Sequence, residues 1–160
     1  MARRKSVNFI RNIGVDSRFG SESVQKLINV VMERGKKSIA RQIVYDAFEV
    51  LIKKAQGDSD KALKIFSKAL EQITPVVEVR PRRVGGSVYQ IPVEVGEHRG
   101  RSLALRWLVS SAAVRKDKTM GLRLAHELLD AYDGTGNAFK KKIDAHKIAD
   151  SNRAFAHFAW

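Results

Sequence analysis

A cluster of arginines beside two consecutive glycines is the feature of this chain with the clearest chemical meaning. No acidic residue lies between Glu78 and Glu94, and this stretch contains the cations and turn residues Arg80, Arg82, Arg83, Gly85 and Gly86. Guanidinium groups offer planar donor forks to phosphate oxygens and flat faces to bases. Protection of a strand edge from aggregation rarely needs three arginines at one bend. The cluster therefore predicts contact with RNA or DNA.

The residues around the glycine pair have the pattern of a β-hairpin. Two adjacent glycines allow the positive φ values of a tight turn. Pro81 and Pro92 lack an amide donor, so neither strand is expected to lie inside a large sheet. An isolated two-stranded hairpin is marginal in water, and we expect this one to rest against another part of the chain. Four apolar residues alternate along the second strand and share one face: Tyr89, Ile91, Val93 and Val95.

Further cations gather at the N-terminus and in three other places. Residues 1–15 contain no acid before Asp16 and follow no helical or strand period. This is typical of a basic arm that becomes ordered on a polyanion, the alternative being a solubilising tail. Arginines near the start of a helix oppose its dipole, a cost that a bound anion would offset. The candidate anion-binding cations are Arg3, Arg4, Lys5, Arg11, Lys36, Lys37, Arg99, Arg101, Arg106, Lys140, Lys141 and Lys142.

The patterns of an enzyme or a metal protein are missing from the sequence. There is no cysteine, and the four histidines are not spaced as ligand pairs on a helix. Gly134-Thr135-Gly136 followed by Lys140 resembles a phosphate loop only faintly, because the Gly-Lys-Ser/Thr ending and the preceding strand are absent. No serine lies in a nucleophile elbow. We therefore expect no catalysis, no metal ion and no cofactor.

Six amphipathic helices are expected, three on each side of the hairpin, and they begin near Ser21, Lys36, Asp58, Leu103, Thr119 and Asn137. Gly35 and Gly57 should end the first two helices, and Pro75 should end the third. Gly96 and Gly100 should loosen the connection to the fourth helix, which we expect to be the central one. The three aromatic residues at the C-terminus are expected to pack on the core, with stacking on bases as the alternative.

These elements predict a mainly α, six-helix single domain with one protruding β-hairpin between the third and fourth helices. We expect a basic N-terminal arm over residues 1–18 and a helical domain over residues 19–160, with the hairpin at about 76–92.

The 160 residues carry 30 Lys and Arg against 17 Asp and Glu, a net charge of +13. This balance favours a nucleic acid, an anionic membrane or an acidic protein as partner. A membrane is the weakest choice, because no apolar run is long enough to span one and no secretory signal is present. The lack of cysteine suits a reducing interior compartment.

Residues 82–95, with the sequence Arg-Arg-Val-Gly-Gly-Ser-Val-Tyr-Gln-Ile-Pro-Val-Glu-Val, resemble the diagnostic hairpin of the bacterial-type small-subunit ribosomal protein seven family. The resemblance extends from about residue 19 to residue 160, through segments 19–21, 35–38, 104–107, 122–128 and 149–157. The hairpin positions that match are Arg82, Arg83, Gly85, Gly86 and Tyr89, whereas the N-terminal arm matches in basic character only. The chain departs from the family pattern at Pro81, in lacking a Pro-Asp-Pro turn before Phe19, and in its Phe158-Ala159-Trp160 ending.

The resemblance implies a six-helix fold and a primary binder of small-subunit ribosomal RNA that nucleates assembly of the subunit head. It also implies that the hairpin lies at the subunit interface, near the exit-site transfer RNA and the path of messenger RNA. The implied protein neighbours are the ninth and eleventh proteins of the small subunit, and no membrane or homo-oligomer is implied. The compartment would be the cytoplasm of a bacterium, with an organellar ribosome as the alternative.

Two other classes of protein fit part of the pattern. A DNA-binding regulator with a winged helix-turn-helix would read duplex DNA as a dimer. A helical interaction module would use its charge for solubility alone. Competition between duplex DNA and structured ribosomal RNA would separate the three hypotheses.

Overall fold

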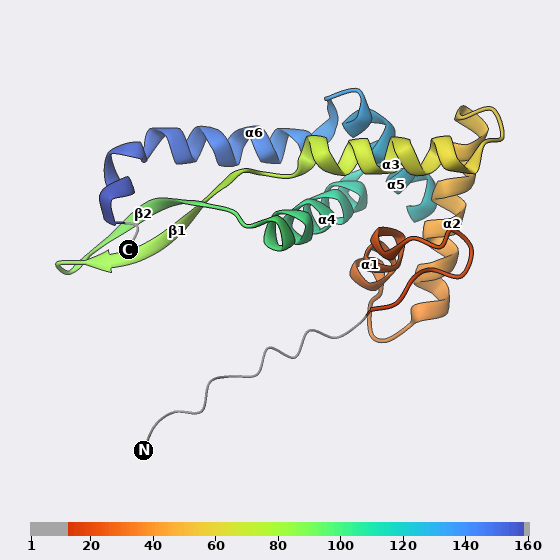
Figure 1. Ribbon diagram of the computed structural model, residues 1–160, viewed down its shortest axis with the longest axis horizontal. Helices are drawn as coiled ribbons and strands as arrows, with labels where there is room; N and C mark the ends of the chain where they lie inside the picture. The colour runs from red at the N-terminus through yellow and green to blue at the C-terminus, as the bar shows by residue number, and fades with distance from the viewer. Residues whose placement is uncertain (1–12, 159–160) are drawn as a thin grey trace, which may run out of the picture.

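The computed structural model describes residues 13–158, which form a mainly helical domain with a single hairpin in that range (Figure 1). This confirms the predicted architecture, including the place of the hairpin between the third and fourth helices. The elements are α1 (Glu22–Val31), α2 (Lys37–Lys54), α3 (Ser59–Ile73), β1 (Val77–Val84), β2 (Ser87–Glu94), α4 (Glu97–Val114), α5 (Met120–Tyr132), α6 (Gly136–Ser151) and the 3-10 helix η1 (Arg153–Phe158).

Helices α1 to α5 form the body of the domain around one apolar core. The core is built from fully buried side chains on all five helices, among them Leu27, Phe48, Phe66, Leu108 and Leu128. Helix α5 packs against α2, α3, α4 and α6. Helix α4 likewise packs against four helices, α1, α3, α5 and α6, so the fourth helix shares the central position with α5. No described helix is long and apolar enough to cross a bilayer.

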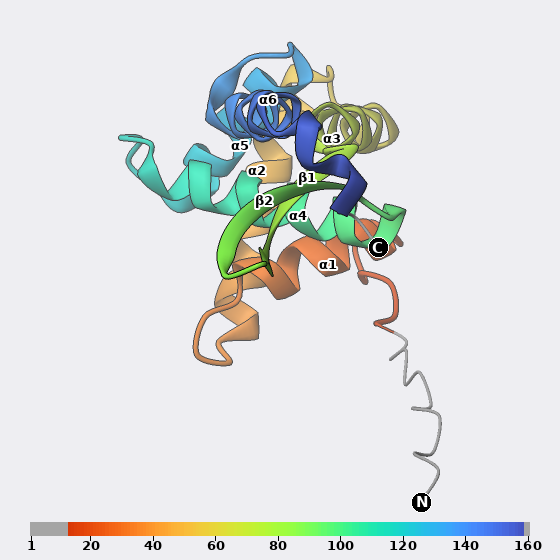
Figure 2. The same ribbon diagram turned by 90° about the vertical axis from the view of Figure 1, so that its left-hand side faces the viewer.

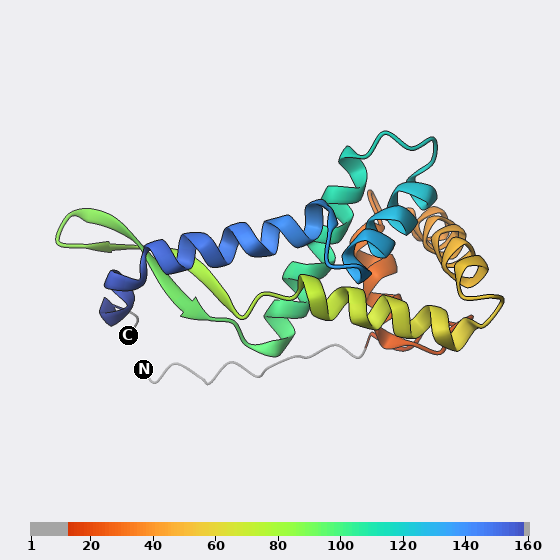
Figure 3. The same ribbon diagram turned by 90° about the horizontal axis from the view of Figure 1, so that it is seen from above.

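Helix α6, the hairpin and η1 form an arm that extends from one end of this body (Figures 1 and 3). The hairpin runs beside α6 and contacts it through both strands, and η1 folds back onto β2. Figure 2 looks along α6 and shows the hairpin beneath it. The hairpin therefore rests on another part of the chain, as the sequence predicts.

The hairpin has a two-residue turn. Val84 pairs with Ser87, and the intervening Gly85 and Gly86 have φ values of +57° and +91°. Positive φ at both central positions suits the right-handed twist of the flanking strands and explains why two glycines are needed. Strand β1 continues through Pro81, which lies opposite Gln90. Each strand of a two-stranded sheet has a free edge, where a missing amide donor is tolerated.

Two expected helix boundaries are set by local hydrogen bonding and are confirmed. The Asp58 carboxylate accepts hydrogen bonds from the amides of Asp60 and Lys61, at 2.9 and 3.1 Å. The Thr119 hydroxyl accepts one from the amide of Leu122 at 3.3 Å. Both side chains satisfy amides that the first turn of a helix leaves unpaired.

Other expected boundaries were wrong. Helix α1 ends at Val31, not at Gly35. At the end of α2, Gln56 takes the left-handed conformation with φ +60°, and the Gly57 amide reaches back to the Ile52 carbonyl at 2.9 Å. This is a Schellman cap, in which Gln56 is the first left-handed residue after the helix. Gly57 therefore lies one position beyond the place expected for the glycine that ends the helix.

The starts of α4 and α6 also differ from expectation. Helix α4 begins at Glu97, so Gly100 lies inside the helix and not in a loose connection. A Cβ atom at Gly100 would lie only 3.0 Å from Thr74 Cγ2, which explains the glycine by close packing. Helix α6 begins at Gly136, so Asn137 lies within its first turn and is not its cap.

A buried glutamate fixes the start of α6. Glu127 of α5 is fully buried, and its carboxylate accepts a hydrogen bond from the Ala138 amide at 2.7 Å. The same carboxylate accepts from the guanidinium of Arg115, which also binds Asp130 at 2.8 Å. Burial acts against the charge of Arg115, but these hydrogen bonds outweigh it and raise its pKa. The network joins the α4–α5 loop, α5 and α6, and thereby holds the root of the extended arm.

Candidate nucleic-acid interface

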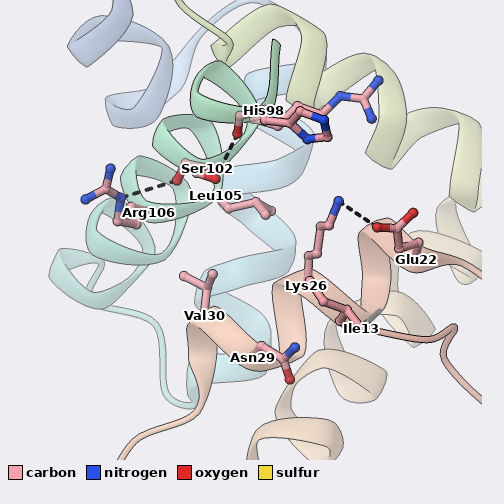
Figure 4. Close-up of a pocket in the computed structure, with 10 residues that line it drawn as sticks. Ile13, Glu22, Lys26, Asn29, Val30, His98, Ser102, Leu105 and Arg106 are labelled. Atoms are coloured by element: carbon pink, nitrogen blue, oxygen red, sulfur yellow. Dashed lines mark hydrogen bonds and ion pairs between the residues drawn. The ribbon is translucent and has the colours of Figure 1, made fainter. Parts of the chain in front are cut away.

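A groove between α1 and α4 carries two of the predicted RNA-binding residues (Figure 4). It encloses about 410 Å³ and receives Arg101 and Arg106 from α4. Val30 of α1 and Leu105 of α4 form its apolar floor, and Ile13 closes it on the side of the N-terminal segment. Leu105 belongs to the core, so the floor is a direct extension of it.

Two cations of the groove remain open to solvent. Arg101 forms an ion pair with Glu97 at 2.6 Å, but more than half of each side chain is exposed. Arg106 donates its Nε–H to the Ser102 carbonyl at 3.4 Å and forms no ion pair among the described residues. Exposed ion pairs contribute little in water, so a phosphate could displace Glu97 at small cost.

Lys26 and Glu22 form the opposite wall. Their charged groups lie 2.8 Å apart, one helical turn from each other. The hydrogen bond and positive charge of Lys26 lower the pKa of Glu22. The pair is neutral overall, which leaves Arg101 and Arg106 as the main positive charges of the groove.

Arg99 and Arg80 do not join the groove, although the sequence predicted both as nucleic-acid contacts. Both donate to the carboxylate of Glu78 in β1, Arg99 at 2.8 Å. Burial favours the neutral form of Glu78, but the two arginines outweigh this effect and lower its pKa. Glu78 is therefore a connection between the base of the hairpin and the first turn of α4, and it occupies one nitrogen of each arginine. About half of each arginine side chain stays exposed.

The two arginines at the tip of the hairpin point to opposite faces. Arg82 pairs with Tyr89 and Arg83 with Val88, and successive residues of a strand alternate in direction. Arg82 faces η1, where its Nη1 lies 3.5 Å from the Phe158 carbonyl. Arg83 and Val88 are exposed on the other face.

Tyr89 holds the C-terminal segment. Its ring lies 5.0 Å from that of Phe155 and 5.8 Å from that of Phe158, measured between centroids. These C-terminal aromatics therefore pack on the hairpin, and not on the helical core as expected. Trp160 lies outside the described residues.

The three lysines of α6 have different roles. Lys140 is exposed. Lys141 donates to the Ser110 hydroxyl at 2.6 Å and so connects α6 to α4. Lys142 donates to the Gln72 carbonyl at 2.8 Å and so connects α6 to α3, and burial lowers its pKa. Only Lys140 keeps its ammonium group without such a contact.

The remaining predicted cations lie elsewhere. Lys36 and Lys37 are exposed at the start of α2. Arg3, Arg4, Lys5 and Arg11 lie outside the described residues. The structure thus brings Arg101 and Arg106 together in one groove, and it does not gather the other candidates around them. Residues 13–158 contain no group of three or more His, Asp or Glu side chains that could hold a metal ion.

The half of the groove that α1 contributes was not predicted from the sequence. Asn29 and Val30 lie on the face of α1 that meets α4, and His98 lies at the start of α4. The only signal in the sequence was the Glu22 and Lys26 pair at helical spacing. Nothing in the sequence shows that α1 lies beside α4.

Comparison with known proteins assigns the chain that carries this groove and hairpin to a family. A family model described as ribosomal protein S7p/S5e matches residues 2–153, which is most of the chain. The chain belongs to the ribosomal protein S7p/S5e family. RNA binding and a part in translation follow from membership. The family resemblance seen in residues 82–95 is confirmed, and it rules against the DNA-binding regulator and the interaction module.

Curated relatives in the S7p/S5e family cover the chain almost completely. A protein named small ribosomal subunit protein uS7 from Thermodesulfovibrio yellowstonii is 53% identical over 150 residues, which is 94% of each chain. Proteins of the same name from Pseudothermotoga lettingae and Mycoplasmopsis synoviae are 51% and 49% identical over 160 residues, the full length of both chains in each case.

Proposed function

We propose that this chain is a primary binder of small-subunit ribosomal RNA and that it nucleates assembly of the subunit head. As a member of its family, it is a structural constituent of the small ribosomal subunit in the bacterial cytoplasm. The observation that carries the proposal is the groove between α1 and α4. There Arg101 and Arg106 lie exposed beside an apolar floor, in a chain of net charge +13. Exposed guanidinium groups on a rigid helix suit a structured RNA backbone.

The binding surface extends beyond the groove. We assign residues 1–18 to an RNA-binding arm and residues 19–160 to the helical domain. Ile13 lines the groove, so the arm enters the domain at the proposed binding surface. Exposed Lys36, Lys37 and Lys140 would add phosphate contacts at its edges. Lys141 and Lys142 act mainly by fixing α6, and Arg80 and Arg99 by fixing the hairpin.

The hairpin serves a different ligand in this proposal. It extends away from the body beside α6, where it can reach a ligand that the groove does not contact (Figure 1). Arg82 and Arg83 would lie near exit-site transfer RNA and the path of messenger RNA, with Tyr89 holding η1 against the ribbon. The ninth and eleventh small-subunit proteins are the proposed protein neighbours, and the chain acts as one copy per subunit.

Binding to a transcript of the three-prime major domain of small-subunit ribosomal RNA tests the first part. The double variant Arg101→Gln, Arg106→Gln should bind more weakly, and its slope of log affinity against log salt should fall by about two. The matched control is Lys53→Gln, Lys64→Gln, which removes two exposed charges on α2 and α3. Equal losses in the two double variants would show that only net charge matters. Tighter binding to duplex DNA than to the transcript would refute the proposed ligand.

Shortening the hairpin tests the division of roles. A minimal turn between Arg80 and Tyr89 should leave transcript binding nearly intact and change retention of exit-site transfer RNA or reading-frame accuracy. The thermal midpoint of the shortened protein, compared with that of the full chain, monitors its folding. If a folded, shortened protein no longer binds the transcript, the hairpin belongs to the assembly surface.

A further inference from the structure

We propose that the groove between α1 and α4 holds an unstacked nucleobase of the RNA, with the flanking phosphates on its cationic rim. This inference rests on the proposed RNA-binding function and assigns a ligand to the same groove. It differs from a purely electrostatic surface, because a base would be held by contacts that do not depend on salt.

The apolar floor is the first reason. Val30 and Leu105 face the space between the two helices in Figure 4, and Ile13 is 41% exposed beside them. A phosphate gains nothing from an apolar floor, since loss of its hydration is costly there. A base has an apolar face of its own. The volume of about 410 Å³ falls within the range of about 300–1,000 Å³ that is usual for small-molecule sites.

The polar groups in the groove are the second reason. Asn29 Oδ1 accepts a hydrogen bond from Gln25 Nε2 at 3.3 Å, and the Asn29 amide nitrogen makes no other described contact. This amide can donate to a ring nitrogen or carbonyl on the edge of a base. On the α4 side, Ser102 donates its hydroxyl proton to the His98 carbonyl at 2.9 Å, which leaves its oxygen able to accept.

The rim supplies the third reason. Arg101 and Arg106 both lie on α4 and line the groove. Figure 4 shows His98 one turn before Ser102 on the same helix. Contacts with phosphates fix the position of a nucleic acid, and contacts with base edges select the nucleotide. An apolar floor, a free amide and a cationic rim therefore match a nucleotide that has left its helix. Proteins typically recognise RNA sequence at loops and bulges, where bases are unstacked.

The test fills the groove without changing its charge. Ser102 is exposed on α4, so Ser102→Phe adds a ring at the wall of the groove at little risk to folding. The matched control is Ser67→Phe, which adds the same ring at an exposed position of α3. A second variant, Asn29→Ala, removes the amide and adds no volume. Circular dichroism and the thermal midpoint confirm that each variant is folded.

Affinity for the three-prime major domain transcript is then measured across a salt series. Loss of one base contact should weaken binding of Ser102→Phe about 5- to 140-fold, with the salt slope unchanged. Asn29→Ala should also weaken binding to the transcript with the salt slope unchanged, but by a smaller factor than Ser102→Phe. Arg106→Gln should instead lower the slope by about one. A perfectly paired RNA duplex should bind wild type and Ser102→Phe equally, because it presents no unstacked base.

Dimethyl sulfate probing gives a direct result. At least one reactive, unpaired base of the free transcript should be protected by wild type and by Ser67→Phe, but not by Ser102→Phe. Equal affinity and equal protection for the two phenylalanine variants would overturn the inference and leave the proposed function intact. The inference would also be overturned if Ser102→Phe lowered the salt slope of transcript binding. The same holds if Ser102→Phe weakened binding to the paired duplex as much as binding to the transcript. If wild type fails to bind the transcript, the proposed function fails and this inference fails with it.

Discussion

Substitution of Glu78 by glutamine tests how the hairpin is held to the body. The change keeps the size of the side chain and removes the charge that Arg80 and Arg99 share. The Glu78 side chain is 11% exposed, whereas those of Arg99 and Arg80 are 49% and 51% exposed. Exposed ion pairs contribute about 0–1 kcal/mol each, and breaking a fully buried pair costs about 3–5 kcal/mol.

Because both arginines are half exposed, the loss of stability in Glu78→Gln should lie between these two limits and closer to the lower one. We expect a loss of about 1–2 kcal/mol in the free energy of unfolding at pH 7, or a fall of about 2–8 °C in the thermal midpoint. Urea and thermal unfolding measure both quantities. The control is Glu94→Gln, an exposed glutamate in β2 without a described ion pair, which should change stability by less than about 0.5 kcal/mol. Equal effects of the two substitutions would refute the role given to Glu78.

The pH dependence of the same pair of proteins gives a second, independent result. The pKa of Glu78 is lowered in the folded protein from an ordinary value of 4.5. A carboxylate with a lowered folded-state pKa stabilises the protein above its unfolded pKa, and this contribution is lost as pH falls through the folded value. The stability difference between wild type and Glu78→Gln should therefore be constant above about pH 5 and shrink in acid. A difference that grows in acid would contradict this explanation.

Three further predictions concern other contacts. Glu127→Gln should lower the free energy of unfolding, measured in urea, by about 3 kcal/mol. This is the low end for a broken buried ion pair, because Arg115 keeps its contact with Asp130. A loss below about 1 kcal/mol would show that the network contributes little to stability. Phe155→Ala should speed amide hydrogen exchange throughout η1, since the contact with Tyr89 is lost. Exchange no faster than in the control Arg153→Ala, at an exposed position of η1, would count against that contact. Deletion of residues 1–11 should flatten the salt dependence of RNA binding, and an unchanged slope would mean that the arm is only a tail.

The features that follow from local pattern could be predicted from the sequence. The Gly85-Gly86 turn depends on backbone conformation at two positions. The caps at Asp58 and Thr119 depend on side chains that bond to amides two or three residues away. Helical periodicity and capping also predicted the number and order of the six α-helices, because each amphipathic face extends over several turns, whereas the 3-10 helix η1 was not predicted.

The features that depend on distant contacts could not be predicted. Gly100 has the sequence appearance of a loop residue, but it lies inside α4, and the reason for the glycine is the close approach of Thr74. Arg99 has the sequence appearance of an RNA contact, but it pairs with Glu78, 21 residues earlier in the chain. The arginines of the groove were identified, whereas Asn29 and Val30 were not, because only the packing of α1 against α4 brings them together.

Sedimentation with small ribosomal subunits is the most direct test of the central claim. The tagged full-length chain is expressed in a bacterium, and extracts are separated on sucrose gradients at moderate salt. We predict that the protein sediments with the small subunit and that the Arg101→Gln, Arg106→Gln variant shifts toward the free fraction, more than the Lys53→Gln, Lys64→Gln control does. Recovery of the folded wild-type protein only in the free fraction would contradict the claim that this chain binds small-subunit ribosomal RNA.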